Sequence, residues 1–397
     1  MRRTTSIAFV AAALAVAAAV PAGASRGGAP EPVRFATYNA SLNRFNQGDL
    51  LADLLEVEAG VPSGSNAEVI IEIIEIIDAD VLLVNEFDFD EDAAALFAEL
   101  TGYPHHFVAP SNTGVPSGFD LNNSGTVGGP DDAFGFGFFP GQFGMLVLSR
   151  FPLGETRTFQ RFLWKDMPGA LLPDDPATPG PADWYSDDEL EVFRLSSKSH
   201  WDVEIELSGE QSVHFLVSHP TPPVFDGPED RNGTRNHDEI RFWADYLLPS
   251  RSGYIYDDEG VYGGLTGGAS FVIAGDQNSD PFDGDSIPGS AQLLLEHPRV
   301  NTKVTPSSEG AVEAAELQGG ANDTHLSDPA HDTADFSDTA PGNLRADYVL
   351  PSKGLRIVDA GVFWPVSSDP LSALTGTFPF PSSDHRPVWI DLWVPGV

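Results

Sequence analysis

Short apolar runs recur along the chain and are separated by polar segments rich in Gly, Pro, Asp and Ser. Runs of four to eight residues with many β-branched and aromatic side chains predict buried strands. We therefore expect strands at Val33–Tyr38, Val81–Val84, Met145–Leu148, Val203–Leu207, Val213–Val217, Phe271–Ala274, Tyr348–Leu350, Ile357–Phe363 and Val388–Trp393.

Helical periodicity appears between several of these runs. In Ala67–Ile77, one face is apolar and the opposite face carries three glutamates, as expected for a helix that covers a core. Similar patterns predict helices at Glu91–Leu100, His237–Leu248 and Gly289–Glu296. Strands that alternate with helices predict an α/β fold built in layers.

Three segments interrupt this pattern. Ser111–Gly144 is rich in Gly and Phe, Pro168–Glu189 is rich in Pro and Asp, and Thr302–Gly342 is polar and low in complexity. Because the polar clusters described below lie on both sides of each segment, we interpret the segments as long loops of one domain.

The N-terminus has the three parts of a secretory signal peptide. A basic start, Met1-Arg2-Arg3, precedes an apolar run from Ile7 to Val20 and the small residues Ala22-Gly23-Ala24. We expect residues 1–24 to be removed near Ala24, which leaves one domain at 25–397 and a secreted, extracellular protein. The apolar run is short for a membrane anchor, and no later stretch is apolar for long enough, so we expect no stable membrane insertion.

Charge and cysteine content restrict the chemistry. The chain has 59 acidic and 21 basic residues and a formal charge of −38. Removal of residues 1–24 takes away two arginines and no acid, which brings the charge to −40. A field of this sign repels polyanions at long range. The composition also shows no excess of basic residues of the kind that binds nucleic acid. The absence of cysteine excludes disulfides, thiolate metal sites and thiol nucleophiles.

Polar residues follow four of the predicted strands and precede the last one. Asn39, Glu86, His219 and the triplet Asp276-Gln277-Asn278 each come directly after an apolar run, and Ser383-Asp384-His385-Arg386-Pro387 precedes the final run. Each cluster alone is typical of an ordinary turn. Together, carboxylates, amides and histidines at strand ends are what a metal-assisted site on an α/β scaffold requires.

The order of these clusters resembles a known family. The segments "FATYNAS", "ADVLLVNEFD", "FLVSHP", "VIAGDQNSDP", "RADYVLPS" and "SSDHRPVWIDL" are similar to the successive signatures of the endonuclease/exonuclease/phosphatase superfamily, which contains the deoxyribonuclease I-like enzymes. The resemblance extends from about Val33 to Trp393. It implies a four-layer α/β sandwich in which two packed mixed β-sheets are flanked by helices.

The resemblance also implies a metal site. Glu86 is expected to be the main ligand, with Asn39 and Asp384 close by. All three are oxygen donors, which suits Mg²⁺ first, with Mn²⁺ and Ca²⁺ as alternatives.

The remaining roles implied by the resemblance concern proton transfer and phosphate contact. Asp276 is expected to deprotonate the attacking water, and Asn278 to donate to the water or to a phosphate oxygen. His385 is expected to contact the scissile phosphate, with its other ring nitrogen held by Asp347. His219 is expected to stabilise phosphate charge or to protonate the leaving group.

We thus expect a secreted, monomeric phosphoester hydrolase that depends on a divalent metal and is of the phosphodiesterase or nuclease type. Its substrate is a phosphate ester, either nucleic acid or a small organic phosphate. The alternatives are an extracellular phosphomonoesterase, a sphingomyelinase-like phospholipid hydrolase, and a non-catalytic calcium- or surface-binding protein.

Two sets of residues match none of the family motifs, and the sequence leaves their roles undecided. The first is basic and serves either to grip a substrate phosphate or to form surface ion pairs: Arg194, Lys198, Arg231, Arg235 and Arg241. The second is aromatic and serves either to contact lipid or bases or, as we prefer, to pack under a long loop: Phe134, Phe136, Phe138, Phe139 and Phe143.

Overall fold

A computed structural model describes residues 31–208 and 211–395. From Pro32 onward the chain forms one compact unit. The expected signal peptide at residues 1–24 lies outside the described residues. In the part of the chain that is described, no helix is both long and apolar enough to cross a membrane.

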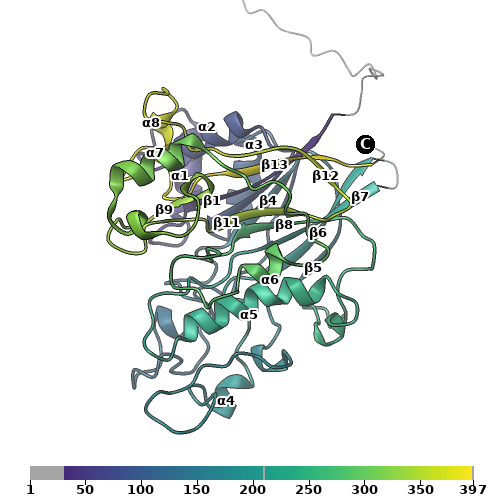
Figure 1. Cartoon of the computed structure of the whole chain (residues 1–397), viewed down its shortest axis with the longest axis vertical. Helices are drawn as coiled ribbons and strands as arrows, with labels where there is room; N and C mark the ends of the chain where they lie inside the picture. Colours follow the sequence, from purple (N-terminus) through teal and green to yellow (C-terminus); the bar gives the residue numbers. More distant parts are fainter. Residues whose placement is uncertain (1–30, 209–210, 396–397) are drawn as a thin grey trace, which may run out of the picture. The chain divides into compact units, whose positions relative to one another are not determined.

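Two mixed β-sheets form the centre of the unit (Figure 1). The first has the order β12-β13-β1-β2-β4-β3, and the second β11-β8-β7-β6-β5. The first sheet contains β1 (Val33–Leu42), β2 (Val81–Phe87), β3 (His105–Phe107), β4 (Met145–Ser149), β12 (Arg356–Val362) and β13 (Val388–Trp393). The second contains β5 (Leu153–Thr158), β6 (His200–Ser208), β7 (Gln211–Ser218), β8 (Phe271–Asp276) and β11 (Asp347–Pro351). A small ribbon pairs β9 (Ala334–Asp335) with β10 (Asn343–Leu344).

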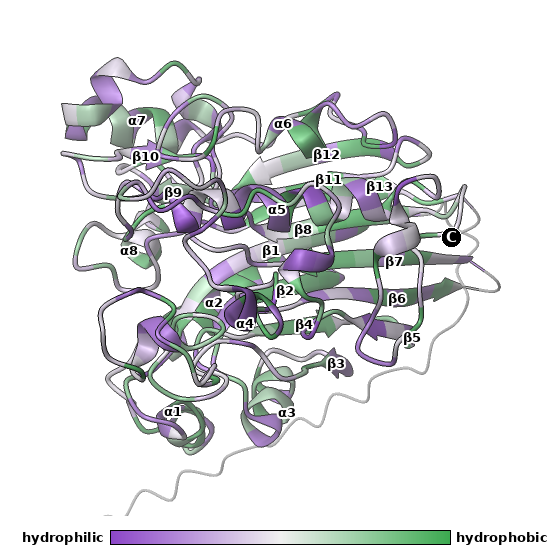
Figure 2. Cartoon of the chain, turned by 90° about the horizontal axis from the view of Figure 1, so that it is seen from below, coloured by the Kyte–Doolittle hydropathy of each residue, from purple (hydrophilic) through white to green (hydrophobic). Residues whose placement is uncertain are grey.

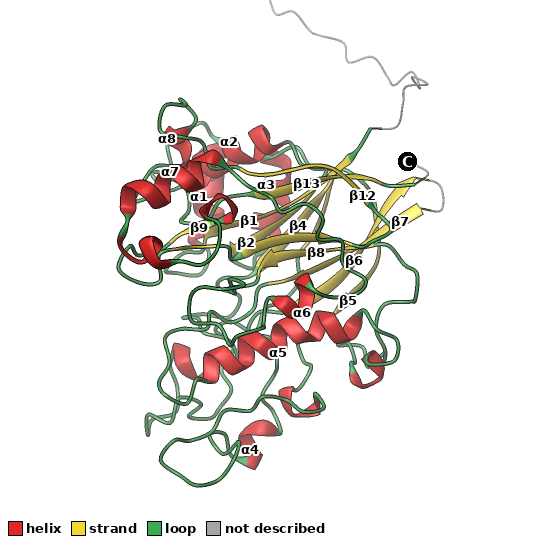
Figure 3. Cartoon of the chain, viewed as in Figure 1, coloured by secondary structure: helices red, strands yellow, loops and turns green. Residues whose placement is uncertain are grey.

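Helices lie outside both sheets (Figure 3). The first sheet packs against α1 (Asp49–Glu58), α2 (Ala67–Ile77) and α3 (Glu91–Leu100), and the second against α5 (Arg231–Tyr246) and α6 (Gln292–Leu295). The other helices are α4 (Asp187–Leu190), α7 (Glu309–Gln318) and α8 (Ser372–Thr375). Short 3₁₀ turns are η1 (Pro130–Asp132), η2 (Trp164–Asp166), η3 (Ser252–Tyr254), η4 (Gly320–Thr324) and η5 (Pro329–His331).

Alternation along the strands creates the layers. In β1, Phe35 faces the second sheet, where it packs against Phe215 with ring centroids 5.7 Å apart, whereas Ala36 and Tyr38 face α1–α3. Figure 2 shows apolar residues along the central strands of both sheets. One core therefore fills the space between the sheets, and one lies under each helical layer. This arrangement confirms the predicted four-layer sandwich.

Every predicted strand is present, and the helices at Ala67–Ile77 and Glu91–Leu100 have the predicted bounds. The prediction of loop throughout Thr302–Gly342 was wrong, because α7 and β9 lie within it. The Ser308 side chain caps α7 by accepting from the Ala311 amide at 3.2 Å. The sequence of α7 is rich in Ala and Glu and has little apolar periodicity, which is why pattern alone missed it.

The topology brings the chemically important strand ends to one edge. β1 is parallel to β2, and β7 is parallel to β8, so their C-terminal ends coincide. β11 and β13 are antiparallel to their neighbours, so their first residues lie at the same edge. In register, Asn39 pairs with Asn85, and Asp347 pairs with Asp276.

Candidate active site

Backbone geometry at this edge is unusual. Gly275 (φ 143°) lies so close to β7 that a Cβ atom would be 2.0 Å from the Ser218 carbonyl oxygen. The next residue, Asp276, therefore follows a position that only glycine can occupy. Glu86 (φ 59°) and Asn278 (φ 51°) adopt left-handed conformations that side-chain-bearing residues rarely take. Such strain is concentrated at functional sites in proteins and is consistent with one here.

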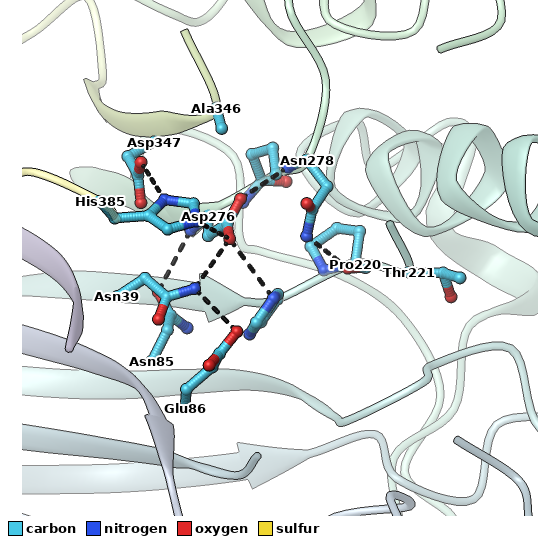
Figure 4. A network of polar contacts seen from close by, with 12 residues as sticks. Asn39, Asn85, Glu86, Pro220, Thr221, Asp276, Asn278, Ala346, Asp347 and His385 are labelled. Atoms are coloured by element: carbon cyan, nitrogen blue, oxygen red, sulfur yellow. Dashed lines mark hydrogen bonds and ion pairs between the residues drawn. The ribbon is translucent and has the colours of Figure 1, made fainter. Parts of the chain in front are cut away.

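Asp276 is the hub of the polar network (Figure 4). Its Oδ2 accepts from Asn39 Nδ2 at 3.1 Å and lies 3.4 Å from His219 Nε2 and 3.6 Å from His385 Nε2. Its Oδ1 accepts from the Asn278 amide at 2.8 Å. Burial raises the pKa of Asp276 to about 7, although His385 acts to lower it. A carboxylate with this pKa exchanges its proton near neutral pH.

His385 and Asp347 form a buried ion pair. His385 Nδ1 lies 2.8 Å from Asp347 Oδ2, which also accepts from Thr333 Oγ1 at 2.8 Å. Burial by itself lowers the pKa of His385, but Asp347 and Asp276 outweigh it and hold that pKa well above its ordinary value. The imidazole is therefore cationic at neutral pH, with Nε2 directed toward Asp276.

His219 differs from His385 in its charge state. Burial, Lys198 and His385 all lower its pKa well below the ordinary value, so the ring is neutral. Its Nδ1 atom is buried and has no hydrogen-bond partner among the described residues. No side chain in the described structure therefore backs this histidine in the way that Asp347 backs His385.

The predicted metal ligands lie together at the same edge. Asn39 Nδ2 donates to Glu86 Oε1 at 3.1 Å, and Asn43 Nδ2 donates to Glu86 Oε2 at 3.2 Å. Burial raises the pKa of Glu86, and the negative charge of Asp384 raises it further. Within residues 31–208 and 211–395, no cationic side chain lies within 4.0 Å of either carboxylate.

This donor set fits a hard divalent cation, because two neighbouring carboxylates among the described residues have no cationic side chain at ion-pair distance. Asn39 departs from the prediction in one detail, since its Nδ2 group rather than its Oδ1 faces the carboxylates. Another tight group of metal-binding residue types joins Asp276, Asp347 and His385, whose potential ligand atoms all lie within 4.8 Å of one another.

Sequence reasoning missed the residues that hold the loops of the site. Glu239 on α5 accepts from the amides of Ser197 and Thr221, each at 2.6 Å. Asn236, one turn earlier, donates to the carbonyls of Thr221 and Gln277 at 2.8 and 2.9 Å. These bonds tie the segments after β7 and β8 to one helix. The helical pattern predicted at His237–Leu248 gave no indication of these polar contacts.

The structure separates the five basic residues. Arg194 donates to Asn112 Oδ1 at 2.6 Å, Arg235 donates to backbone carbonyls, and Arg231 pairs with Glu229. Arg241 lies 3.2 Å from Asp245. Lys198 alone borders a cavity beside Glu86 and His219 without a hydrogen bond or ion pair in the described part of the chain.

The Phe-rich segment has two parts. Phe134 is buried beneath the Arg194 guanidinium, which lies 4.3 Å from its ring centroid. Phe136 and Phe138, in contrast, are 50% and 62% exposed. The preferred interpretation, core packing, therefore fails for these two side chains.

The comparisons with known proteins agree with this geometry. A sequence profile described as "Endonuclease/Exonuclease/phosphatase family" matches residues 36–385. The chain belongs to this family. Members of the endonuclease/exonuclease/phosphatase family are metal-dependent phosphoester hydrolases, and the chain is such an enzyme.

One solved structure shows the same fold, and two others match with lower TM-scores. An endonuclease/exonuclease/phosphatase from Beutenbergia cavernae DSM 12333 is 17% identical, with a TM-score of 0.51 over 92% of this chain and 72% of that one. A family protein from Leptotrichia buccalis is 13% identical, with a TM-score of 0.47 over 91% of this chain and 100% of that one. The catalytic domain of human nocturnin with bound sulfate is 15% identical, with a TM-score of 0.46 over 91% and 93%. Comparison with curated protein sequences found no match.

Proposed function

We propose that this family member hydrolyses small phosphodiesters by direct attack of water. The observation that supports the proposal is the buried Asp276 carboxylate, whose Oδ2 faces an amide, a neutral imidazole and a cationic imidazole within 3.6 Å. A base, hydrogen-bond donors and a fixed positive charge at one point are what water attack on phosphorus requires.

In this mechanism Asp276 accepts a proton from water while the water oxygen forms a bond to phosphorus. The ester P–O bond breaks, and the leaving oxygen takes its final proton from solvent. The His385 imidazolium offsets the negative charge on the phosphoryl oxygens, and Asp347 keeps it protonated and oriented. Because His219 is neutral, we assign it hydrogen-bond donation to the leaving oxygen. Asn278 donates from its side chain to the water or to a phosphoryl oxygen.

A divalent metal fits beside this group of residues. Glu86, Asp384 and Asn39 would hold it, and Mg²⁺ suits their oxygen donors. When bound, it supplies positive charge to the phosphoryl group.

Charge at the site favours a diester over a monoester. Four carboxyl groups, those of Glu86, Asp276, Asp347 and Asp384, lie around the His385 imidazolium. A phosphodiester carries one negative charge at neutral pH, whereas a monoester approaches two. Repulsion from the carboxylates therefore penalises the monoester more strongly.

The whole chain also disfavours long polyanions. Its formal charge is −38, and four of the five basic residues considered above are held by Asn112, Glu229, Asp245 or backbone carbonyls. A small ester meets mainly the local field of the site, whereas a nucleic acid also meets the acidic surroundings.

We further propose that the enzyme is exported and monomeric, with residues 1–24 removed and residues 25–397 forming the catalytic domain. The basic start, apolar run and small residues before Ser25 support export and cleavage.

The test is a substrate panel with bis(4-nitrophenyl) phosphate, 4-nitrophenyl phosphate and plasmid DNA, each with Mg²⁺, Mn²⁺ or Ca²⁺. We expect the highest kcat/KM for the diester, and no turnover in excess chelator. Glu86→Gln should lower turnover at least about a hundredfold, whereas the same change at the exposed Glu56 on α1 should leave it unchanged. Full diesterase activity in chelator, or a monoester preferred over the diester, would contradict the proposal.

A further inference from the structure

A second cavity adjoins the site on the side of the Phe-rich segment. Its volume is about 470 Å³, within the range of about 300–1,000 Å³ typical of small-molecule sites. Its walls are largely apolar, and they include Leu121, Phe136, Phe143, Tyr185, Phe193 and Phe225. Several of these rings already pack against one another, with centroids 4.7 Å apart for Tyr185 and Phe193 and 6.5 Å apart for Phe136 and Phe143.

This cavity meets the larger one that contains the catalytic residues. The larger cavity has a volume of about 1140 Å³ and is bordered by Asp276 and His385. The two cavities share Glu86 and His219, together with residues of the segment after β7 that includes Phe225. A phosphorus atom beside Glu86 and His219 therefore has space on two sides, and a phosphodiester has two ester groups to place there.

Lys198 provides a charged group in the second cavity. Its side chain is only 6% exposed and borders the cavity beside Glu86. Across the described ranges, its ammonium makes no hydrogen bond and no ion pair. The nearby Glu239 carboxylate is already occupied by the amides of Ser197 and Thr221. The Lys198 side chain therefore borders the cavity with its hydrogen-bonding capacity unused by the protein, and an anionic ligand there can accept from it.

The other cations of the cavity are held by the protein itself. Arg231 pairs with Glu229. Arg235 donates to the carbonyls of Leu195 and Phe134, and its guanidinium lies 4.7 Å from the centroid of the Phe193 ring. Among the described residues, Lys198 is thus the cation of this cavity without a hydrogen-bond or ion-pair partner in the protein.

We propose that the second cavity is a substrate subsite that receives an aryl ester group of a phosphodiester, while Lys198 donates to a non-bridging phosphoryl oxygen. Flat aromatic groups pack edge to face or offset against the rings that line the cavity. The inference rests on the proposed function, since it names the class of diester that the same site accepts, namely one with an aromatic ester group.

Binding of two analogues tests the aryl preference without turnover. Methyl benzylphosphonate and methyl methylphosphonate each present one anionic phosphoryl group and differ in the aromatic ring. By calorimetry, we expect the benzyl compound to bind about tenfold to a hundredfold more tightly, because burial of the ring removes apolar surface from water.

Two variants locate this preference. Phe136→Ala combined with Phe143→Ala should reduce the preference to less than about threefold, because it removes two walls of the cavity. Phe282→Ala removes an exposed ring that borders neither cavity, and it should retain the preference. Equal affinity of the wild-type enzyme for the two analogues, or loss of the preference in Phe282→Ala alone, would overturn the aryl subsite.

Lys198→Met tests the contribution of the Lys198 charge to affinity separately from that of the aromatic walls. It should weaken both analogues to a similar extent, by about tenfold or more, and leave the ratio between them unchanged. Unaltered affinity for both analogues in a folded variant would remove Lys198 from the phosphoryl contact. Circular dichroism and urea unfolding check that the variant folds, and Lys198→Arg, which keeps the charge, should restore part of the affinity.

The outcomes also separate this inference from the proposed function. If the aryl analogue is preferred but no phosphodiester is hydrolysed, the subsite stands and the proposed function fails. If diesters are hydrolysed with no preference for aromatic ester groups, the proposed function stands and the subsite fails.

Discussion

Asp332 offers a quantitative test of the electrostatics of this acidic fold. Its side chain is 2% exposed, and its Oδ1 atom has no hydrogen-bond partner among the described residues. Burial raises its pKa to about 8, and the negative charges of Asp280, Asp283 and Asp328 add to that effect. The carboxyl group is therefore protonated in the folded protein at neutral pH.

The cost to stability follows from proton linkage. The ordinary pKa of this group is 3.8, so the unfolded chain releases the proton at a pH where the folded chain keeps it. Between these two pKa values the folded state binds more protons, and the free energy of unfolding falls as pH rises. At pH 7 the accumulated loss is about 4 kcal/mol, and it approaches about 6 kcal/mol above pH 8.

Asp332→Asn removes this loss while keeping the shape of a protonated carboxyl group. We expect the variant to match the wild type near pH 4 and to be more stable by about 4 kcal/mol at pH 7. Urea unfolding in excess chelator, followed by tryptophan fluorescence at about pH 5, 7 and 9, measures the difference. Asp323→Asn, an exposed aspartate with the same charge change, should alter stability by less than about 0.5 kcal/mol at each pH.

A different result would refute the reasoning. If Asp332→Asn is as stable as the wild type at pH 9, ionisation of Asp332 does not lower the free energy of unfolding, and the pKa of this carboxyl group is close to its ordinary value. If the variant is less stable, the carboxylate is ionised and compensated by a cation.

Three further predictions concern catalysis and export. Asp347→Asn should lower kcat at least about a hundredfold with little change in KM, because Asp347 acts through His385. A rise in KM as large as the fall in kcat would indicate a role in substrate binding. Raising salt from roughly 20 to 500 mM should improve kcat/KM for DNA more than for a small diester, because repulsion is screened; a steep fall for DNA would reveal a basic groove. N-terminal sequencing of the exported protein should begin near Ser25, and a retained Met1 would contradict cleavage.

The sequence predicted the layered core well, because burial on both faces leaves long apolar runs. β8 reads FVIAGD and is buried along its whole length, and it was predicted to within two residues. β5 was missed because the same criterion fails at a sheet edge. Leu153–Thr158 is an edge strand in which no residue is fully buried. Its sequence therefore has no apolar run.

The expected catalytic residues were chosen through motif order, and the structure brings them to one edge of the sheets. Lys198 could not be assigned from the sequence, because its importance depends on what Glu239 does on a distant helix. Only the fold shows that the Glu239 carboxylate is occupied by two backbone amides and that the lysine is left facing a cavity. The same applies to Phe136 and Phe138, whose exposure depends on the path of a long loop.

The placement of β1 beside β13 has a consequence for how the site assembles. Residues Val33–Thr37 of β1 pair with Val388–Leu392 of β13, and Asp384 and His385 lie just before that strand. Asn39 and Glu86 lie on the same sheet but come from a distant part of the sequence. The expected metal ligands and His385 therefore meet only when segments far apart along the chain have paired, so local folding of either segment alone cannot form the reaction centre.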